Sequence, residues 1–104
     1  MKEKSEFFKR AVKLLVMLID ITAEMGKVSE IFFSDETGYP EYKAGDETRY
    51  VYGAKVMHGD VYCYTCEYPE YADNSDCWVR ISDLEGLSVA DVAECVANYT
   101  ESTE

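Results

Sequence analysis

The amino-acid sequence predicts an α+β fold, a single two-layer domain with an N-terminal helix, an antiparallel sheet of three to four strands and a C-terminal helix. Three observations lead to this class. Residues 5–27 have helical periodicity, short β-branched and aromatic segments fill the middle of the chain, and a second helical segment begins at Ser88. Helices and strands that do not alternate favour segregated layers over parallel βαβ units. The length favours one domain over residues 1–104, because two smaller units would each lack a core.

The first helix is predicted over Ser5–Lys27, with Gly26 closing it. At about 100° per residue its polar side chains fall on a narrow stripe, and its apolar side chains cover roughly 220°, about twice the arc that a helix on one sheet needs. The helix therefore needs two partners. The sheet and the second helix can supply them, or part of the arc is an interface in a homodimer or with another protein. Leu14, Leu18 and Ile21 are the candidate interface residues.

Four strands are expected between the helices. The clearest two form a hairpin through residues 58–60, where Gly59 allows the positive φ of a tight turn. Residues 34–47 combine acidic side chains with glycine and proline, so they are expected to form a long exposed connection with a short extended piece around Tyr42. The predicted strands are Val28–Phe33, Thr48–Met57, Val61–Tyr68 and Cys77–Ser82.

The start of the C-terminal helix has a recognisable sequence pattern. Ser88 and Asp91 occupy the two positions of a capping box, and Leu87 and Val92 occupy those of a hydrophobic staple. Val92 and Val96 share one helical face, which is expected to be buried.

Cys63 and Cys66 have the C-x-x-C spacing of a zinc knuckle or a redox pair. Within a continuous strand, however, residues three apart point to opposite faces and lie about 10 Å apart, so they can neither form a disulfide nor share a tetrahedral metal. We therefore expect all four cysteines to be reduced and most of them to be buried, with no metal bound. If a zinc site exists, its candidate ligands are His58, Cys63, Cys66 and Cys77.

Motifs that would indicate catalysis are missing from the sequence. The single histidine, His58, falls at the predicted hairpin turn, and no glycine-rich phosphate loop is present. Residues 73–76 lack the alternation and the glycine of a calcium-binding loop. We expect no enzymatic activity and no cofactor. A zinc-binding domain or enzyme that uses His58 and the cysteines is the alternative.

The chain carries 21 acidic and 10 basic side chains, a net charge of −11. Such a charge repels nucleic acids and anionic membranes and attracts basic proteins. The expected partner is a protein with a basic surface, with no direct binding of nucleic acid and no membrane association. The apolar run at residues 14–19 ends at Asp20 without a cleavage site, so it is not expected to be a signal peptide, and we expect a cytoplasmic protein.

Four carboxylates between residues 67 and 76, in the loop before the last predicted strand, recur at every third residue, with aromatic residues between them. In a polyproline II conformation three residues make one turn, so the four would project on one side at intervals of about 9 Å. This spacing suggests an imitation of a nucleic-acid backbone, although a charged loop that only keeps the protein soluble has the same composition. The candidate partner-binding residues are Glu67, Tyr68, Glu70, Tyr71, Asp73 and Asp76.

In size, charge and element order the chain resembles some phage-encoded inhibitors that act as DNA mimics, including certain anti-CRISPR and anti-restriction proteins. No motif carries this resemblance, so it assigns no residue a role. The functional expectation is a non-enzymatic acidic binding module, in its sharpest form a nucleic-acid-mimicking inhibitor of a basic nucleic-acid-binding protein. A small homodimeric protein-interaction domain is a further alternative, beside the zinc-binding domain or enzyme.

Overall fold

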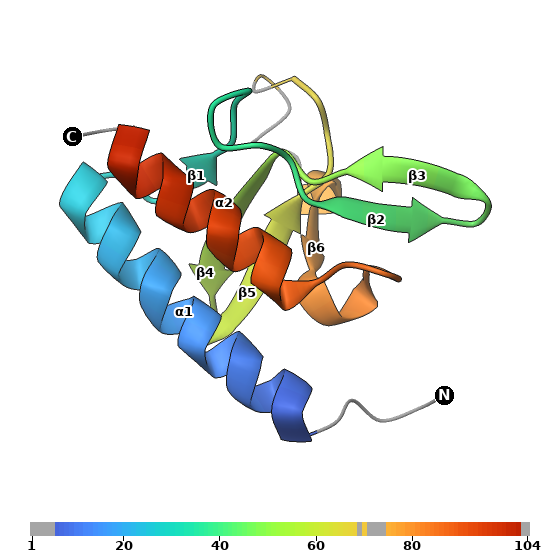
Figure 1. The fold of residues 1–104 in the computed structure, drawn as a ribbon, viewed down its shortest axis with the longest axis horizontal. Coiled ribbons are helices and arrows are strands. Elements are labelled where there is room, and N and C mark those ends of the chain that lie inside the picture. The colour runs from blue at the N-terminus through green and yellow to red at the C-terminus, as the bar shows by residue number, and fades with distance from the viewer. Residues whose placement is uncertain (1–5, 69, 71–74, 103–104) are drawn as a thin grey trace.

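The computed structural model describes residues 6–68, 70 and 75–102, and it has the predicted α+β class (Figure 1). An N-terminal helix, a four-stranded antiparallel sheet and a C-terminal helix form one compact domain. A second sheet of two strands, not predicted as such, projects from it. The elements are α1 (Glu6–Gly26), β1 (Ile31–Phe32), β2 (Glu41–Ala44), β3 (Glu47–Tyr50), β4 (Gly53–Met57), β5 (Asp60–Tyr64), β6 (Trp78–Arg80) and α2 (Val89–Ser102).

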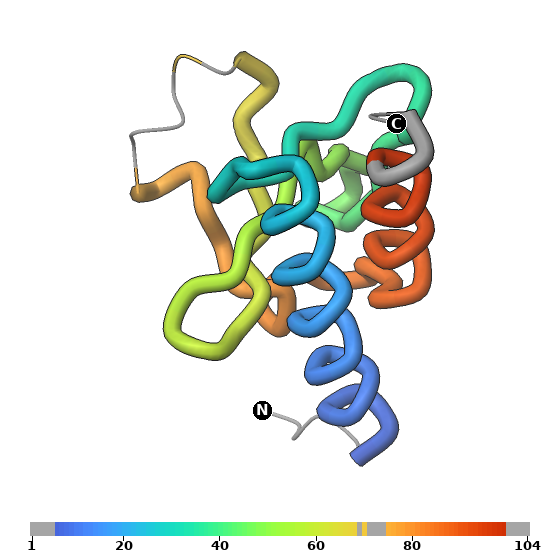
Figure 2. Tube along the Cα trace, turned by 90° about the vertical axis from the view of Figure 1, so that its left-hand side faces the viewer, coloured from blue at the N-terminus to red at the C-terminus, as the bar shows by residue number. Residues whose placement is uncertain are grey.

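The main sheet has the strand order β1-β4-β5-β6, and every neighbouring pair is antiparallel. Both helices cover the same face of this sheet and run side by side in the same direction (Figures 1 and 2). Successive side chains along a strand point to opposite faces of the sheet, so each face carries its own row of side chains. The row facing the helices belongs to the main core and crosses all four strands at Ile31, Ala54, Cys63 and Val79.

The opposite face of the sheet carries an aromatic row, in which Gly53 lies between Phe32 and Tyr64, and Trp78 follows Tyr64. The rings of Tyr64 and Trp78 are 4.9 Å apart, and those of Phe32 and Tyr64 are 5.6 Å apart. A Cβ on Gly53 would lie 2.8 Å from the carbonyl oxygen of Ile31 and 3.2 Å from the Phe32 ring. The absence of a side chain at Gly53 therefore lets Phe32 and Tyr64 approach each other over β4.

Helix α1 packs on the sheet through Leu15 and Ile19 and lies against α2 on its other side. The two partners anticipated for its wide apolar arc are thus both present. The helix ends at Gly26, as predicted, but the left-handed residue is Lys27 (φ 55°). The Val28 N–H donates to the Ala23 carbonyl at 2.9 Å, which is the hydrogen bond of a Schellman motif.

The predicted strand Thr48–Met57 is divided between the two sheets. Its first half is β3, which pairs with β2 in a separate hairpin, and its second half is β4 in the main sheet. At the division, the Val51 N–H donates to the Pro40 carbonyl at 2.8 Å, and Val51 is fully buried. The alternating sequence gave no sign of this division, because the hydrogen-bond partner that creates it lies in the distant segment before β2.

Two local predictions are confirmed. The β4–β5 hairpin closes with a two-residue turn, in which His58 (φ 55°) and Gly59 (φ 74°) both have the positive φ of a type I′ turn. At the start of α2, the Asp91 N–H donates to the Ser88 hydroxyl at 3.3 Å, which is the N-cap bond of the predicted capping box. Strand β6 is shorter than predicted, because the residues on both sides of it form 3-10 helices, Ser75–Cys77 and Ile81–Asp83.

Candidate functional site

Cys66 and Cys77 form a disulfide with their Cα atoms 5.5 Å apart, so the expectation that all four cysteines are reduced was wrong. The expected continuous strand to Tyr68 was also wrong, since β5 ends at Tyr64. Beyond that point the backbone still pairs with the residue before β6, with the Thr65 N–H donating to the Cys77 carbonyl at 2.8 Å. This pairing places Cys66 beside Cys77, a disulfide partner that the C-x-x-C spacing of Cys63 and Cys66 does not indicate.

The two remaining cysteines are free and buried. Burial raises the pKa of the Cys63 thiol to about 12 and that of Cys95 to about 11. Both thiols are therefore protonated at neutral pH, and neither is a ready nucleophile.

The four residues considered for zinc are not brought together. Cys66 and Cys77 are bonded to each other, Cys63 is buried on the helix face of the sheet, and His58 occupies the β4–β5 turn. Within the described part of the chain, no group of three or more His, Cys, Asp or Glu residues has the arrangement of a metal site.

The two ends of the predicted acidic row, Glu67 and Asp76, lie next to the disulfide-bonded Cys66 and Cys77. A polyproline II segment of this length would separate its ends by roughly 30 Å, but the disulfide holds the two ends of the loop together, and Asp76 belongs to a 3-10 helix. A straight row of evenly spaced carboxylates from Glu67 to Asp76 is therefore excluded. Glu67, Tyr68, Glu70 and Asp76 are exposed, whereas Tyr71 and Asp73 lie outside the described residues.

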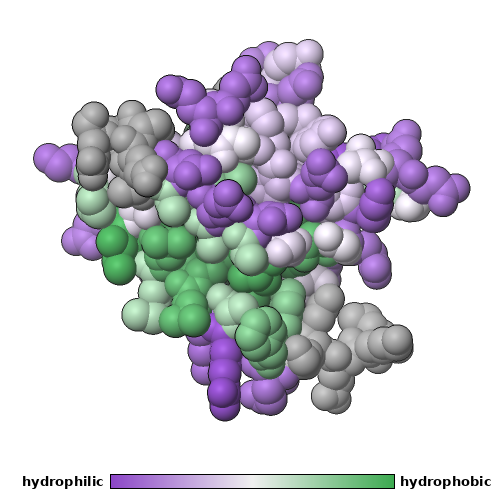
Figure 3. Space-filling view, viewed as in Figure 1, coloured by the Kyte–Doolittle hydropathy of each residue, from purple (hydrophilic) through white to green (hydrophobic). Residues whose placement is uncertain are grey.

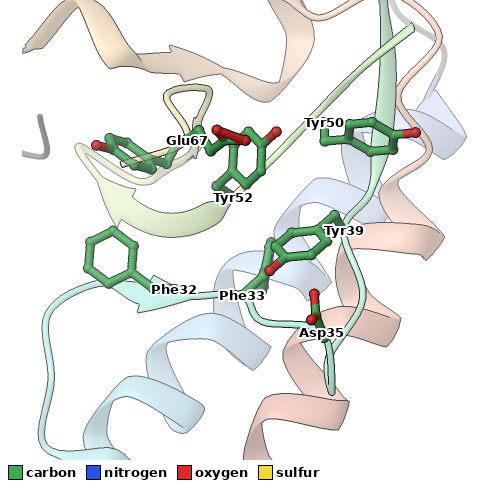
Figure 4. A pocket seen from close by; sticks show the side chains of 8 residues that line it. Phe32, Phe33, Asp35, Tyr39, Tyr50, Tyr52 and Glu67 are labelled. Carbon is green, nitrogen blue, oxygen red and sulfur yellow. The ribbon is translucent and has the colours of Figure 1, made fainter. Parts of the chain in front are cut away.

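The first residue of that row, Glu67, does contribute to a pocket of about 360 Å³. The pocket lies where the end of β1, the loop before β2, the β3–β4 junction and the end of β5 meet (Figure 4). Its volume is in the range of small-ligand sites. Aromatic rings and two carboxylates line it: Phe32, Phe33, Asp35, Tyr39, Tyr50, Tyr52, Tyr64 and Glu67.

A compact turn positions Asp35. The hydroxyl of Thr37, a buried residue, accepts the Ser34 N–H at 2.8 Å, and the Gly38 N–H donates to the Ser34 carbonyl at 2.9 Å. The Asn98 side chain on α2 donates to the Thr37 carbonyl at 3.3 Å, which ties the turn to the helix layer. Asp35 is thus held at the pocket by a hydrogen-bonded turn rather than by a free loop.

Backbone bonds across β1, β4 and β5 fix the opposite wall. The Phe33 N–H donates to the Tyr52 carbonyl at 2.9 Å, and the Tyr52 N–H donates to the Tyr64 carbonyl at 2.7 Å. The rings of Tyr39 and Tyr52 lie 5.3 Å apart. Two aromatic walls therefore converge on one space, with Asp35 beside Tyr39 and Glu67 beside Tyr52 (Figure 4).

The charged side chains among the described residues of the pocket lining are acidic. The pKa of Tyr39 is raised by its burial and by the neighbouring Asp35 carboxylate, and the pKa of Tyr52 is raised by its burial and by Glu67. No lysine or arginine is among the described residues that line the pocket. The neighbouring Arg49 forms a salt bridge with Glu47, at 2.8 Å.

Aromatic faces beside carboxylates attract organic cations, since ring quadrupoles and negative charges act together. The same sheet face already contains one such contact, with the Lys55 ammonium 4.3 Å from the centre of the Trp78 ring. The geometry of the pocket therefore suits a lysine ammonium, an arginine guanidinium or another organic cation. Asp35, Tyr39 and Tyr52 were not selected from the sequence, and the only local signal was the Ser34-x-x-Thr37 turn pattern.

The candidate interface residues on α1 divide into two groups. Leu18 packs against the core, whereas Leu14 and Ile21 are more than half exposed. Leu14 lies at the edge of an apolar groove of about 550 Å³ between α1 and the start of α2. No helix in the described residues is long and apolar enough to cross a membrane.

Compared with known proteins, the chain matches no family model, no curated protein and no solved structure.

Proposed function

We propose that this protein is a non-enzymatic binding module that recognises a basic protein, and that its tyrosine-carboxylate pocket accepts a lysine or arginine side chain of that partner. The observation that supports this proposal is the pocket itself, in which Asp35 and Glu67 lie beside the rings of Tyr39 and Tyr52 with no cation among the described residues of the lining. The net charge of −11 adds a long-range attraction to a basic surface.

A basic nucleic-acid-binding protein is the sharper form of this proposal, with the module acting as an inhibitor that imitates DNA or RNA. Charge supports that form, but the regular carboxylate spacing that first suggested it is lost in the closed loop. Recognition of individual cationic side chains accounts better for the pocket than imitation of evenly spaced phosphates. Protonated thiols on Cys63 and Cys95 favour binding over cysteine-based catalysis.

The experiment compares the binding of a fluorescein-labelled nona-arginine peptide to three forms of the protein at about 150 mM NaCl, a concentration that screens distant charges. The first is the wild type, and the second is Asp35→Asn with Glu67→Gln, which removes both pocket carboxylates without changing side-chain size. The third is a matched control, Glu36→Gln with Asp46→Asn, which loses the same charge at exposed positions that do not line the pocket.

We expect the pocket variant to bind at least tenfold more weakly than the wild type and the control to change less than threefold. Tyr52→Ala should weaken binding by about five- to thirtyfold, because it removes a cation–π contact of about 1–2 kcal/mol. Equal losses in the pocket variant and the control would show that only overall charge attracts the peptide, and the pocket would then have no role. Competition by duplex DNA for a pulled-down native partner would test the inhibitor form.

A further inference from the structure

The outward face of α1 is an apolar stripe that neither the sheet nor α2 covers. Its five large side chains have exposed fractions between 54% and 81%. They recur at helical spacing, so they form one continuous strip along a helix of 21 residues, about 30 Å long. The apolar area over the two helices in Figure 3 marks this face of the molecule. The stripe consists of Phe7, Leu14, Met17, Ile21 and Met25.

The charge on α1 differs from that on the rest of the chain. The helix has three basic residues (Lys9, Arg10 and Lys13) and three acidic residues (Glu6, Asp20 and Glu24), which makes it neutral. The whole chain has a net charge of −11, so the excess of negative charge lies outside this helix. A second copy of so acidic a protein would meet the least electrostatic repulsion at α1.

The order of these charges also specifies a direction. Arg10 and Lys13 lie in the N-terminal half of the helix, and Asp20 and Glu24 lie in the C-terminal half. Among the salt bridges of the described residues, none involves these four side chains. A parallel helix pair would place like charges together, whereas an antiparallel pair would place the basic half of each helix against the acidic half of the other.

We propose that two copies of this chain associate through the apolar stripe, with their α1 helices antiparallel and related by a two-fold axis near the middle of the stripe. Phe7 of one copy then lies near Met25 of the other, and Leu14 lies near Met17. With roughly 150–200 Å² for each large side chain, the exposed parts of the stripe amount to about 500–650 Å² per copy, near the lower end of stable protein interfaces. The apolar groove beside Leu14 adds to this area.

Sedimentation velocity on the full chain tests the proposal. We expect the wild type to reach about twice the chain mass of 11.9 kDa at micromolar to 100 µM concentrations. Leu14→Glu, at a position exposed in the single chain, should leave a folded monomer by circular dichroism. A wild type that remains monomeric at 1 mM, or a Leu14→Glu variant that dimerises as before, would overturn the proposal. So would a monomer that instead cosediments with phosphatidylserine vesicles, because the stripe would then be a membrane-binding face.

Charge variants test the direction of the helices. Arg10→Glu with Lys13→Glu should weaken dimerisation at least tenfold. Adding Asp20→Lys and Glu24→Lys should restore it, because the antiparallel pairing is complementary again. The control is Lys43→Glu with Arg49→Glu, which makes the same double charge change at exposed positions on the β2–β3 hairpin, away from α1, and should alter the dissociation constant less than threefold. Failure of the fourfold variant to dimerise, with its helix content intact, would refute the antiparallel arrangement.

Discussion

The clearest test of the energetics is removal of the Cys66–Cys77 disulfide. The bond closes a loop with a sequence separation of 11. In the unfolded chain, a cross-link of this size removes conformational entropy worth roughly 3 kcal/mol at 25 °C. A domain of this length has a free energy of unfolding of about 5–15 kcal/mol. Opening the loop should therefore remove a large share of the stability and lower the melting temperature by roughly 10–20 °C.

The assay is equilibrium unfolding in urea of Cys66→Ala, Cys77→Ala and the double variant. Either single substitution already opens the loop, so each should cost about 3 kcal/mol, and the double variant should cost about the same plus a small packing loss at the buried Cys77. Dithiothreitol should destabilise the wild type to a similar level and leave the double variant unchanged. Additive costs of the two single substitutions, or no effect of reduction on the wild type, would refute the entropic argument.

Four further predictions follow from individual residues. Gly53→Ala should lower the free energy of unfolding by about 1–3 kcal/mol, because its methyl group would lie 2.8 Å from the Ile31 carbonyl; urea unfolding unchanged from the wild type would contradict this close approach. Lys27→Gly should raise the free energy of unfolding by about 1 kcal/mol in the same assay, because Lys27 has a left-handed backbone. Iodoacetamide at pH 8 should label Cys63 and Cys95 only in denaturant, as judged by mass spectrometry, since both thiols are buried with a raised pKa. The raised pKa of Tyr39 contributes stability that is fully present below about pH 10 and is lost as the pH rises through the folded-state pKa, so Tyr39→Phe should make the alkaline decline in stability shallower, and a steeper decline would show that the sign is wrong.

Local interactions made much of the fold predictable. The cap at Ser88 and the glycine of the β4–β5 turn each act within a few residues, and each has its expected structure. The division of the long predicted strand at Val51 depends instead on the hydrogen bond that the Val51 N–H donates to the Pro40 carbonyl. Sequence alternation contains no information about such a distant partner.

The candidate site was less predictable than the fold, for the same reason. Asp35 lies in a segment expected to be a long exposed connection, and it lines the same pocket as Glu67, which is 32 residues away in the sequence. Glu67 was selected, but as part of a straight row of carboxylates. The disulfide between Cys66 and Cys77 removes that row, and it would also be unusual in a reducing cytoplasm, so the cytoplasmic location stays a prediction.

The edges of the main sheet have a consequence for how copies of this protein can meet. The edge strand β1 has two residues, and β6 has three and lies between two 3-10 helices. Edges this short offer few unpaired backbone groups for adding a strand from another molecule. The β2–β3 hairpin has a longer free edge, but all of β3 is exposed and it carries Glu47 and Arg49, which oppose a dry contact. Addition of strands from other molecules is thus disfavoured along the main sheet. Concentrated solutions should therefore resist amyloid formation, even when α1 is paired with a second copy.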